Sequence, residues 1–187
     1  MGALLGLLTS FSITTSEMFG RTVAKNIGPL VLTAATSLVG AVVAAGAAFV
    51  LGGDPTFGDM ALGGISGVGF GFGMLSYFIG LNASSSAVVS PTVAALTTII
   101  PFTWGAIARD VPPVLAFMGA IAAIVGLMFV TIGGDEASNV RHGLLWGLAS
   151  GLGYGFGSAV LIEVAVDAGA WPAVSQRGFS LLLVIGR

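Results

Sequence analysis

A run of hydroxyl side chains, TSFSITTSE at residues 9–17, lies inside the first long apolar segment of the chain. Hydroxyls such as Ser12 and Thr15 could line the path of a polar solute without the free-energy cost of a charge in hydrocarbon. They could equally donate to carbonyls of the preceding helical turn and tighten packing. Glu17 closes the run and Arg21 follows at i+4, so an ion pair is the simpler interpretation of Glu17. A coupling or substrate role is the alternative.

A second polar cluster, LNASSSAVVSP at residues 81–91, joins two apolar segments. Serine and asparagine are strong N-caps, so Ser84 and Ser85 are interpreted as caps of the following helix. The remaining candidates for the wall of a polar cavity are Tyr77, Asn82, Thr92 and, from a later segment, Tyr154. A wall of hydroxyls and amides without an unpaired cation argues against a multiply charged anion as the solute.

The segment GISG at residues 64–67 spells the G-x-S-G motif of rhomboid-type intramembrane proteases and would make Ser66 a nucleophile. Such a serine needs a histidine within hydrogen-bond reach. The single histidine, His142, is expected in a polar loop. Ser66 should instead lie about 9 Å along its helix. Since the sequence also contains no cluster of metal ligands, we expect no enzyme, no catalytic residues, no metal and no cofactor, and we keep the protease as an alternative.

The composition indicates hydrocarbon as the solvent for most of the surface. Of 187 residues, 56% are hydrophobic and 7% charged, and the mean hydropathy is +1.04. A soluble domain carries roughly 25% charged residues. The net charge of −2 and the absence of a basic tail give no reason to expect nucleic acid as a partner. The absence of cysteine excludes a disulfide framework.

A membrane-spanning helix needs about 20 mostly apolar residues, and charges collect between the spans. Arg21 and Lys25 are expected in the first such turn, and the segments GGDPTFGD, RDVPP and GGDEASNVRH mark later ones. We therefore predict an all-α integral membrane protein with six complete spans, at Ala3–Gly20, Pro29–Leu51, Met60–Leu81, Ser86–Ala108, Pro113–Ile132 and Gly143–Val166. A seventh span begins near Pro172 and is incomplete at Arg187, so we expect the chain to be part of a longer protein.

Two nearly identical glycine runs fall inside these spans, SGVGFGFG at residues 66–73 and SGLGYGFG at residues 150–157. At about 100° per residue, Gly67 and Gly71 share one helix face, and Gly69 and Gly73 share nearly the opposite face. Each pair lets another helix approach backbone to backbone. The third and sixth spans are therefore predicted to be interior helices. Their packing residues would be Gly67, Gly69, Gly71, Gly73, Gly151, Gly153, Gly155 and Gly157.

The chain also contains a weak internal repeat. GALLGL at residues 2–7 and GLLWGL at residues 143–148 each open a span, about 141 residues apart. Downstream, NIGP at residues 26–29 and DAGAWP at residues 167–172 each supply a proline that starts the next span. Five spans separate the two copies, so the second must be inverted, a plan that is typical of secondary transporters. We predict a first five-helix repeat at residues 1–135 and the start of a second at residues 143–187.

The order of these features resembles the drug/metabolite transporter superfamily, specifically its ten-helix members built from two EamA-type repeats. The resemblance covers the whole chain and is carried by SYFIGLNASSSAVVSPTVAALTTIIPFTWGAI, RDVPP and FMGAIAAIVGLMFV. The matching positions are Tyr77, Leu81, Ala83–Ala87, Pro91, Gly119 and Gly126. The resemblance implies a secondary transporter that moves a small organic metabolite or drug by alternating access. The solute would lie near the membrane midplane, between the first, third, fourth and sixth spans.

The chain departs from the family pattern at a few charged positions. Arg109 and Asp110 stand after the fourth span, where a glutamate is usual. Glu17 and Glu163 stand near the end of the first span of each repeat, where a basic residue is usual. An arginine in the second span of the repeat is present in the second copy, as Arg177, and missing from the first.

The resemblance further implies a multi-pass protein of the cell (inner or plasma) membrane. Its partners would be the lipid bilayer and a small-molecule solute, and a homodimer is left open. The alternative is a truncated membrane protein that is inactive in transport and depends on a partner. The Lys and Arg residues near the span ends place the N-terminus outside, whereas the resemblance implies a cytoplasmic N-terminus, and both orientations stay open.

Overall fold

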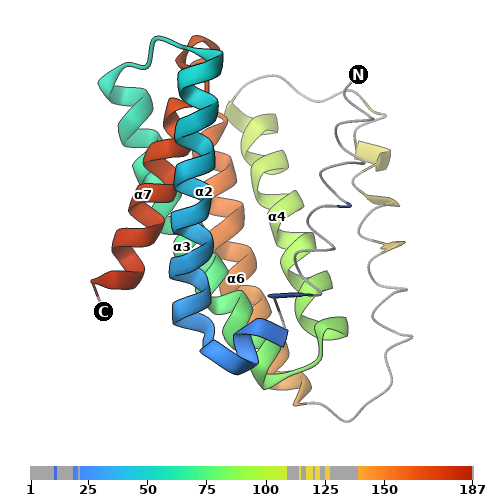
Figure 1. Ribbon diagram of the computed structural model, residues 1–187. Helices are drawn as coiled ribbons and strands as arrows, with labels where there is room; N and C mark the ends of the chain where they lie inside the picture. The colour runs from blue at the N-terminus through green and yellow to red at the C-terminus, as the bar shows by residue number, and fades with distance from the viewer. Residues whose placement is uncertain are drawn as a thin grey trace.

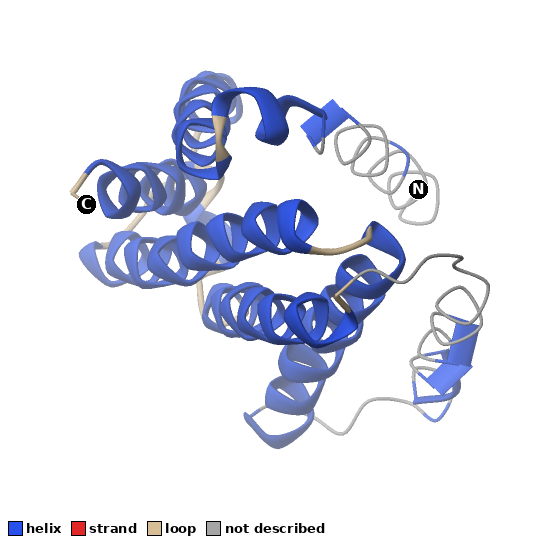
Figure 2. Cartoon of the chain, turned by 90° about the horizontal axis from the view of Figure 1, so that it is seen from below, coloured by secondary structure: helices blue, strands red, loops and turns tan. Residues whose placement is uncertain are grey.

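The computed structural model describes residues 11, 19–20, 22–108, 114, 117–119, 121–122, 125–126 and 139–186. Its elements are the helices α2 (Pro29–Leu51), α3 (Phe57–Ala83), α4 (Ser86–Ala108), α6 (Val140–Leu161) and α7 (Trp171–Ile185), with a short 3₁₀ helix, η1 (Val166–Ala168), before α7 (Figure 1). No strand is found in this part of the chain (Figure 2). The predicted all-α class is confirmed.

Two of the predicted helices, α2 and α4, begin and end at the predicted residues. Helix α3 begins earlier than predicted because Thr56 caps it. The Thr56 hydroxyl accepts a hydrogen bond from the N–H of Asp59, and the Asp59 carboxylate accepts one from the N–H of Thr56. Helix α6 ends at Leu161 rather than at the predicted Val166. The first and fifth predicted spans lie largely outside the described residues.

The turn before α2 is tighter than predicted. Residues 22–27 are helical, so Lys25 lies on a helix and not in a turn. The chain turns at Gly28, whose φ of 85° favours glycine, and Pro29 begins α2. Gly169, with a φ of 61°, holds the equivalent place before α7, which carries Pro172 in its first turn.

Helix α3 is the central helix of the described bundle. Four helices, α2, α3, α4 and α6, are long and apolar enough to cross a membrane, as predicted for an integral membrane protein. In α3, 61% of an 18-residue apolar window is buried inside the protein, compared with 11% in α2 and in α4. Helix α3 lies between α6 and α7, while α7 also packs against α2 and α6 also packs against α4 (Figure 1).

One face of α3 meets α7 through three glycines. The contacts, in the same order along both helices, pair Gly63 with Pro172, Gly67 with Gln176 and Gly71 with Ser180. A Cβ on Gly67 would collide with the backbone carbonyl of Gln176, so a side chain at this position would force the helices apart. Because the residue numbers of both partners rise together, α3 and α7 run parallel.

The opposite face of α3 meets α6, also backbone to backbone. A Cβ on Gly69 would lie 2.8 Å from the carbonyl oxygen of Gly153, and one on Gly153 would lie 2.7 Å from that of Gly69. Helix α6 is itself held on two sides. A Cβ on Gly151 or on Gly155 would lie 2.7 Å or 2.6 Å, respectively, from the side chains of Leu96 and Ile100 in α4.

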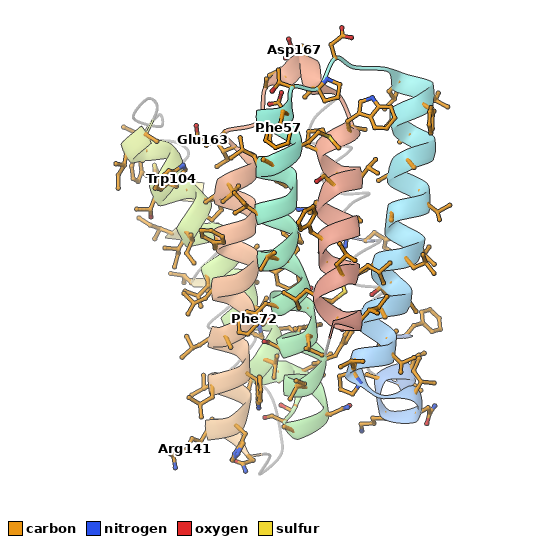
Figure 3. The ribbon with its side chains drawn as sticks, turned by 90° about the vertical axis from the view of Figure 1, so that its left-hand side faces the viewer. Phe57, Phe72, Trp104, Arg141, Glu163 and Asp167 are labelled. Atoms are coloured by element: carbon orange, nitrogen blue, oxygen red, sulfur yellow. The ribbon has the colours of Figure 1, made fainter. Side chains whose placement is uncertain are left out.

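The loops at one end of the bundle bind each other. The N–H of Asp54 donates to the carbonyl of Asp167 at 2.9 Å, and the N–H of Ala165 donates to Oδ1 of Asp59 at 3.0 Å. We call this the acidic end, because the four carboxylates of the described residues lie there: Asp54, Asp59, Glu163 and Asp167. The opposite, basic end carries Arg141 (Figure 3). Lys25 is there too, because its neighbour Ala24 lies beside Asn82 at the end of α3.

We expect Gly67→Ala to lower the free energy of unfolding in detergent by roughly 1–3 kcal/mol, because the new methyl group must push α7 away. The matched control is Gly178→Ala in α7, since nothing lies within 4 Å of its Cβ position. Alanine at this control position should be neutral or stabilising by up to about 1 kcal/mol. Thermal or denaturant unfolding measures both variants. Equal stability of the two would contradict the packing of α3 on α7.

We expect Asp59→Ala to lower the midpoint of thermal unfolding by a few degrees, because it removes the partner of Thr56 and the acceptor for the N–H of Ala165. Asp54→Ala is the control, since Asp54 joins this end through its backbone N–H. If both variants lowered the unfolding midpoint by the same amount, the negative charge at this end would stabilise the protein, and the cap made by Asp59 would contribute nothing.

Candidate functional site

Two predicted solute-path residues, Tyr77 and Tyr154, meet in one cluster. Tyr77 of α3 is buried, and its hydroxyl lies 2.9 Å from Oγ of Ser90 on α4. Tyr154 of α6 packs edge-on against Phe70, with the ring centroids 5.2 Å apart. The core cluster consists of Ala24, Leu32, Tyr77, Phe78, Leu81, Val89 and Val93, with Met74 and Tyr154 packed against it.

The other predicted candidates do not join this cluster in the described part of the chain. Oγ1 of Thr92 donates to the carbonyl of Val88 at 2.8 Å, and the Thr92 side chain fills the space beside Gly147 of α6. Asn82 is exposed at the end of α3, where its Nδ2 lies 3.5 Å from the carbonyl oxygen of Ala24. The remaining candidates, together with Arg21, lie outside the described residues: Ser12, Thr15 and Glu17.

Besides the glycines on two of its sides, α3 carries a candidate solute-binding face, formed by Phe70, Met74 and Tyr77. These residues follow one another at steps of four and three, so they lie on the same side of the helix. Oγ1 of Thr36 on α2 lies 3.0 Å from the Met74 sulfur, and it also lies 2.8 Å from the carbonyl of Leu32, which accepts its hydrogen bond within the helix. We call Phe70, Met74 and Tyr77 the solute face. Met74 and Thr36 could not be predicted from the sequence, because residues of the same types occur throughout the apolar spans.

The first residue of the solute face, Phe70, lies halfway along the bundle. Phe70 is the central residue of α3, about 20 Å from either end of the helix at 1.5 Å per residue. Gly40 is likewise the central residue of α2. The contact of Thr36 with Met74 sets the register of these two antiparallel helices, so Gly40 lies level with Phe70. The ring contact with Phe70 brings Tyr154 to this level too.

Ser66 links three helices. Its fully buried Oγ donates to the carbonyl of Gly157 at 2.8 Å and accepts a hydrogen bond from Nε2 of Gln176 at 2.8 Å. His142 is exposed in the first turn of α6 rather than in the predicted loop, about 22 Å along the helix from Gly157. The described geometry therefore gives the protease alternative no support. Gln176 was missed by the sequence analysis, which treated Ser66 alone.

Glu163 has a partner that the sequence did not suggest. It is exposed, and its Oε1 accepts a hydrogen bond from Nε1–H of Trp104 at 2.9 Å (Figure 3). This contact ties the far end of α4 to the loop that follows α6. Within the described residues, no group of three or more His, Asp and Glu side chains could hold a metal ion.

Arg177 places a positive charge near the middle of the helix bundle. It is half-buried on α7, and its Cδ lies 3.0 Å from the Cβ position of Gly40 on α2. The sequence analysis noted Arg177 only as a position of the family pattern. The sequence-based expectation against multiply charged solutes rested on a site without a cation, and Arg177 is a cation close to the level of Phe70.

The family model described as the EamA-like transporter family matches residues 1–132. The match includes α2, α3 and α4, and therefore the whole solute face and Ser90, and it ends before α6. Comparison with curated proteins and with solved structures gives no match.

We expect the hydroxyl contact between Tyr77 and Ser90 to stabilise the fold by about 0.5–1.5 kcal/mol. A double-mutant cycle of Tyr77→Phe and Ser90→Ala, followed by unfolding in detergent, isolates this pairwise energy. The cycle is needed because Tyr77 has a further interaction.

The control pairs Tyr77→Phe with Thr98→Ala. Oγ1 of Thr98, which is exposed on α4, donates to the carbonyl of Ala94 in its own helix, so no coupling with Tyr77 is expected. A coupling energy near zero for Tyr77 and Ser90 would contradict the contact.

Proposed function

Because this chain belongs to the EamA-like transporter family, whose members are membrane transporters of small solutes, we propose that it is a secondary transporter of a small organic metabolite or drug. It would work by alternating access as a multi-pass protein of the cell (inner or plasma) membrane. The family match covers more than half of the chain, and four described helices are able to span a membrane.

The solute face is the observation that carries this proposal. Ligand sites are mostly apolar and aromatic, with a few polar groups that orient the ligand. Phe70, Met74 and Tyr154 supply the apolar part at mid-depth, and the hydroxyls of Thr36 and Tyr77 lie beside it. Such a surface favours an organic molecule over a hydrated inorganic ion.

The described helices also support the proposed inverted repeats. Gly28 and Gly169 both have positive φ, precede helices that begin with a proline in the first turn, and lie about 141 residues apart. Phe49, near the end of α2, packs against Trp171 at the start of α7, with ring centroids 5.2 Å apart. The two helices are therefore antiparallel, as the second helices of inverted repeats at residues 1–135 and 143–187 should be.

Three described helices are suited to move as one body. Besides the bonds of Ser66, Oγ of Ser180 donates to the carbonyl of Gly67 and Oγ of Ser175 donates to that of Met60, both at 2.7 Å. These bonds tie α7 to α3 over several turns. In hydrocarbon no water replaces a broken bond, so separating these helices would be expensive.

Helix α4 is better suited to bend. It contains Pro91 and Pro101, and Pro91 has no N–H to donate to the preceding turn, which weakens the helix beside Ser90. We propose that α4 bends at Pro91 and separates Ser90 from Tyr77. Tyr77 lies about 9 Å from the basic end of α3, so this step would open the site toward that end.

The test is uptake into proteoliposomes, screened over amino acids, nucleosides and amphiphilic drugs. For any solute that is moved, Phe70→Leu should raise KM about two- to tenfold, because an aromatic contact contributes about 0.5–1.5 kcal/mol. The matched control is Phe72→Leu on the same helix, where the ring is 41% exposed and leucine should leave KM unchanged (Figure 3).

Equal KM values for the two variants would contradict the placement of the solute. Failure of the purified chain to move any solute of the screen would instead favour the alternative, a membrane protein that is inactive in transport and depends on a partner.

A further inference from the structure

Arg177 is a charged side chain near the middle of the bundle. It lies six residues into α7, about 9 Å from the first residue of the helix. Its Cδ and Nε lie 3.0 and 3.1 Å from the Cβ position of Gly40, the central residue of α2. The Arg177 side chain therefore runs across the middle of α2. Charges at this depth are expensive and, as a rule, face a cavity or a partner and have a function.

Within the described residues, no acceptor for the Arg177 guanidinium is found. The four described carboxylates lie at the acidic end, away from Gly40. A second polar group lies nearby, since Ser37 is one turn from Gly40 on the same face of α2. Ser37 is fully buried, and in the described part of the chain its Oγ has no hydrogen-bond partner. Buried polar groups without partners are rare in proteins, so the Ser37 hydroxyl next to a half-buried cation forms a candidate site for a polar ligand.

The site around Arg177 lies at the same depth in the bundle as the solute face and on the side of α2 that contacts it. Gly40, which Arg177 contacts, lies level with Phe70, as the register of α2 and α3 shows. Thr36, which contacts Met74, lies four residues before Gly40 on the same side of α2. A ligand that touches Phe70 and Met74 can therefore extend along α2 toward Arg177.

We propose that Arg177 binds the carboxylate of a monoanionic organic solute, whose apolar part contacts the solute face. This inference rests on the transport function proposed above and names the class of its substrate. A guanidinium binds a carboxylate through two parallel hydrogen bonds. One guanidinium neutralises one carboxylate, whereas a phosphate dianion would keep a net negative charge at mid-depth. The other described cations, Lys25 and Arg141, lie at the basic end and cannot compensate that charge.

The test uses benzoate and benzamide, which have nearly the same shape and differ in charge. The full chain is placed in nanodiscs of neutral phosphatidylcholine, and its thermal unfolding is followed as each compound is added. Benzoate should raise the unfolding midpoint, with half-saturation at a concentration about tenfold or more below that of benzamide. Acetate should act like benzoate but more weakly, because it lacks the ring.

Arg177→Gln should abolish the preference for benzoate. Arg177→Lys should keep part of it, since the charge stays and the planar fork is lost. The matched control is Arg141→Gln, which removes an exposed arginine at the basic end and should leave the preference unchanged.

The unliganded Arg177→Gln protein separates a binding role from a structural one. No described residue accepts a hydrogen bond from Arg177, so the variant should unfold at the same or a higher temperature. A lower midpoint would show that Arg177 pairs with another part of the protein and would overturn the proposal. Equal responses to benzoate and benzamide, no response to benzoate or acetate, or a preference that survives Arg177→Gln would overturn it as well.

The binding and transport experiments test the carboxylate site and the transport function separately. If benzoate binds through Arg177 but no carboxylate is moved in proteoliposomes, the site is supported and the proposed transport function is contradicted. If neutral solutes are moved with unchanged KM by Arg177→Gln, transport is supported and the carboxylate site is overturned.

Discussion

Helices in a membrane gain nothing by hiding leucine from lipid, so their contacts must come from close packing and from hydrogen bonds. In this protein that requirement is met on α3, which has glycine on two opposite faces. Gly67 admits the backbone of α7, and Gly69 admits the backbone of α6. The buried Ser66 then joins both neighbours through Gly157 and Gln176. The positions of the other described helices follow, since α2 packs on α7 and α4 packs on α6.

In our proposal, a helix that is held on two faces presents a third face to the ligand. On α3 this face carries Phe70, Met74 and Tyr77, and the glycine contacts fix its depth and its rotation. We propose that α3, α6 and α7 form the fixed part of the site and that α4 forms the mobile part. Hydroxyl hydrogen bonds join α3 to α6 and α7. Helix α4 packs on α6 through the side chains of Leu96 and Ile100 and the Leu96 carbonyl, and it contains two prolines. In our proposal the solute binds to the fixed part, and α4 controls access to it.

The sequence predicted the features that depend on local chemistry. The bounds of α2 and α4 follow from apolar length and from the proline and polar residues at their ends, and the two glycine faces of α3 follow from the helical period. It did not predict which helices meet. The contacts of Thr36 with Met74, Tyr77 with Ser90 and Trp104 with Glu163 join distant segments, and they depend on the order and rotation of helices that are apolar nearly all round. The depth of Arg177 depends on this arrangement as well.

Disulfide crosslinking in native membranes tests most directly whether α3 lies between α6 and α7. The chain has no cysteine, so introduced pairs react without background. The Cβ position of Gly71 lies 3.3 Å from Cβ of Ser180, and that of Gly80 lies 3.0 Å from Cβ of Trp146. Both distances are slightly shorter than the range of about 3.5–4.5 Å found in disulfides, so a small outward shift brings each pair to bonding distance. We predict that cysteine pairs at 71 and 180 and at 80 and 146 crosslink on mild oxidation. A pair at Gly46 and Gly178, which have no atom within 4 Å of their Cβ positions, should not crosslink. Crosslinking of the control pair with no crosslink in the other two would contradict the central position of α3.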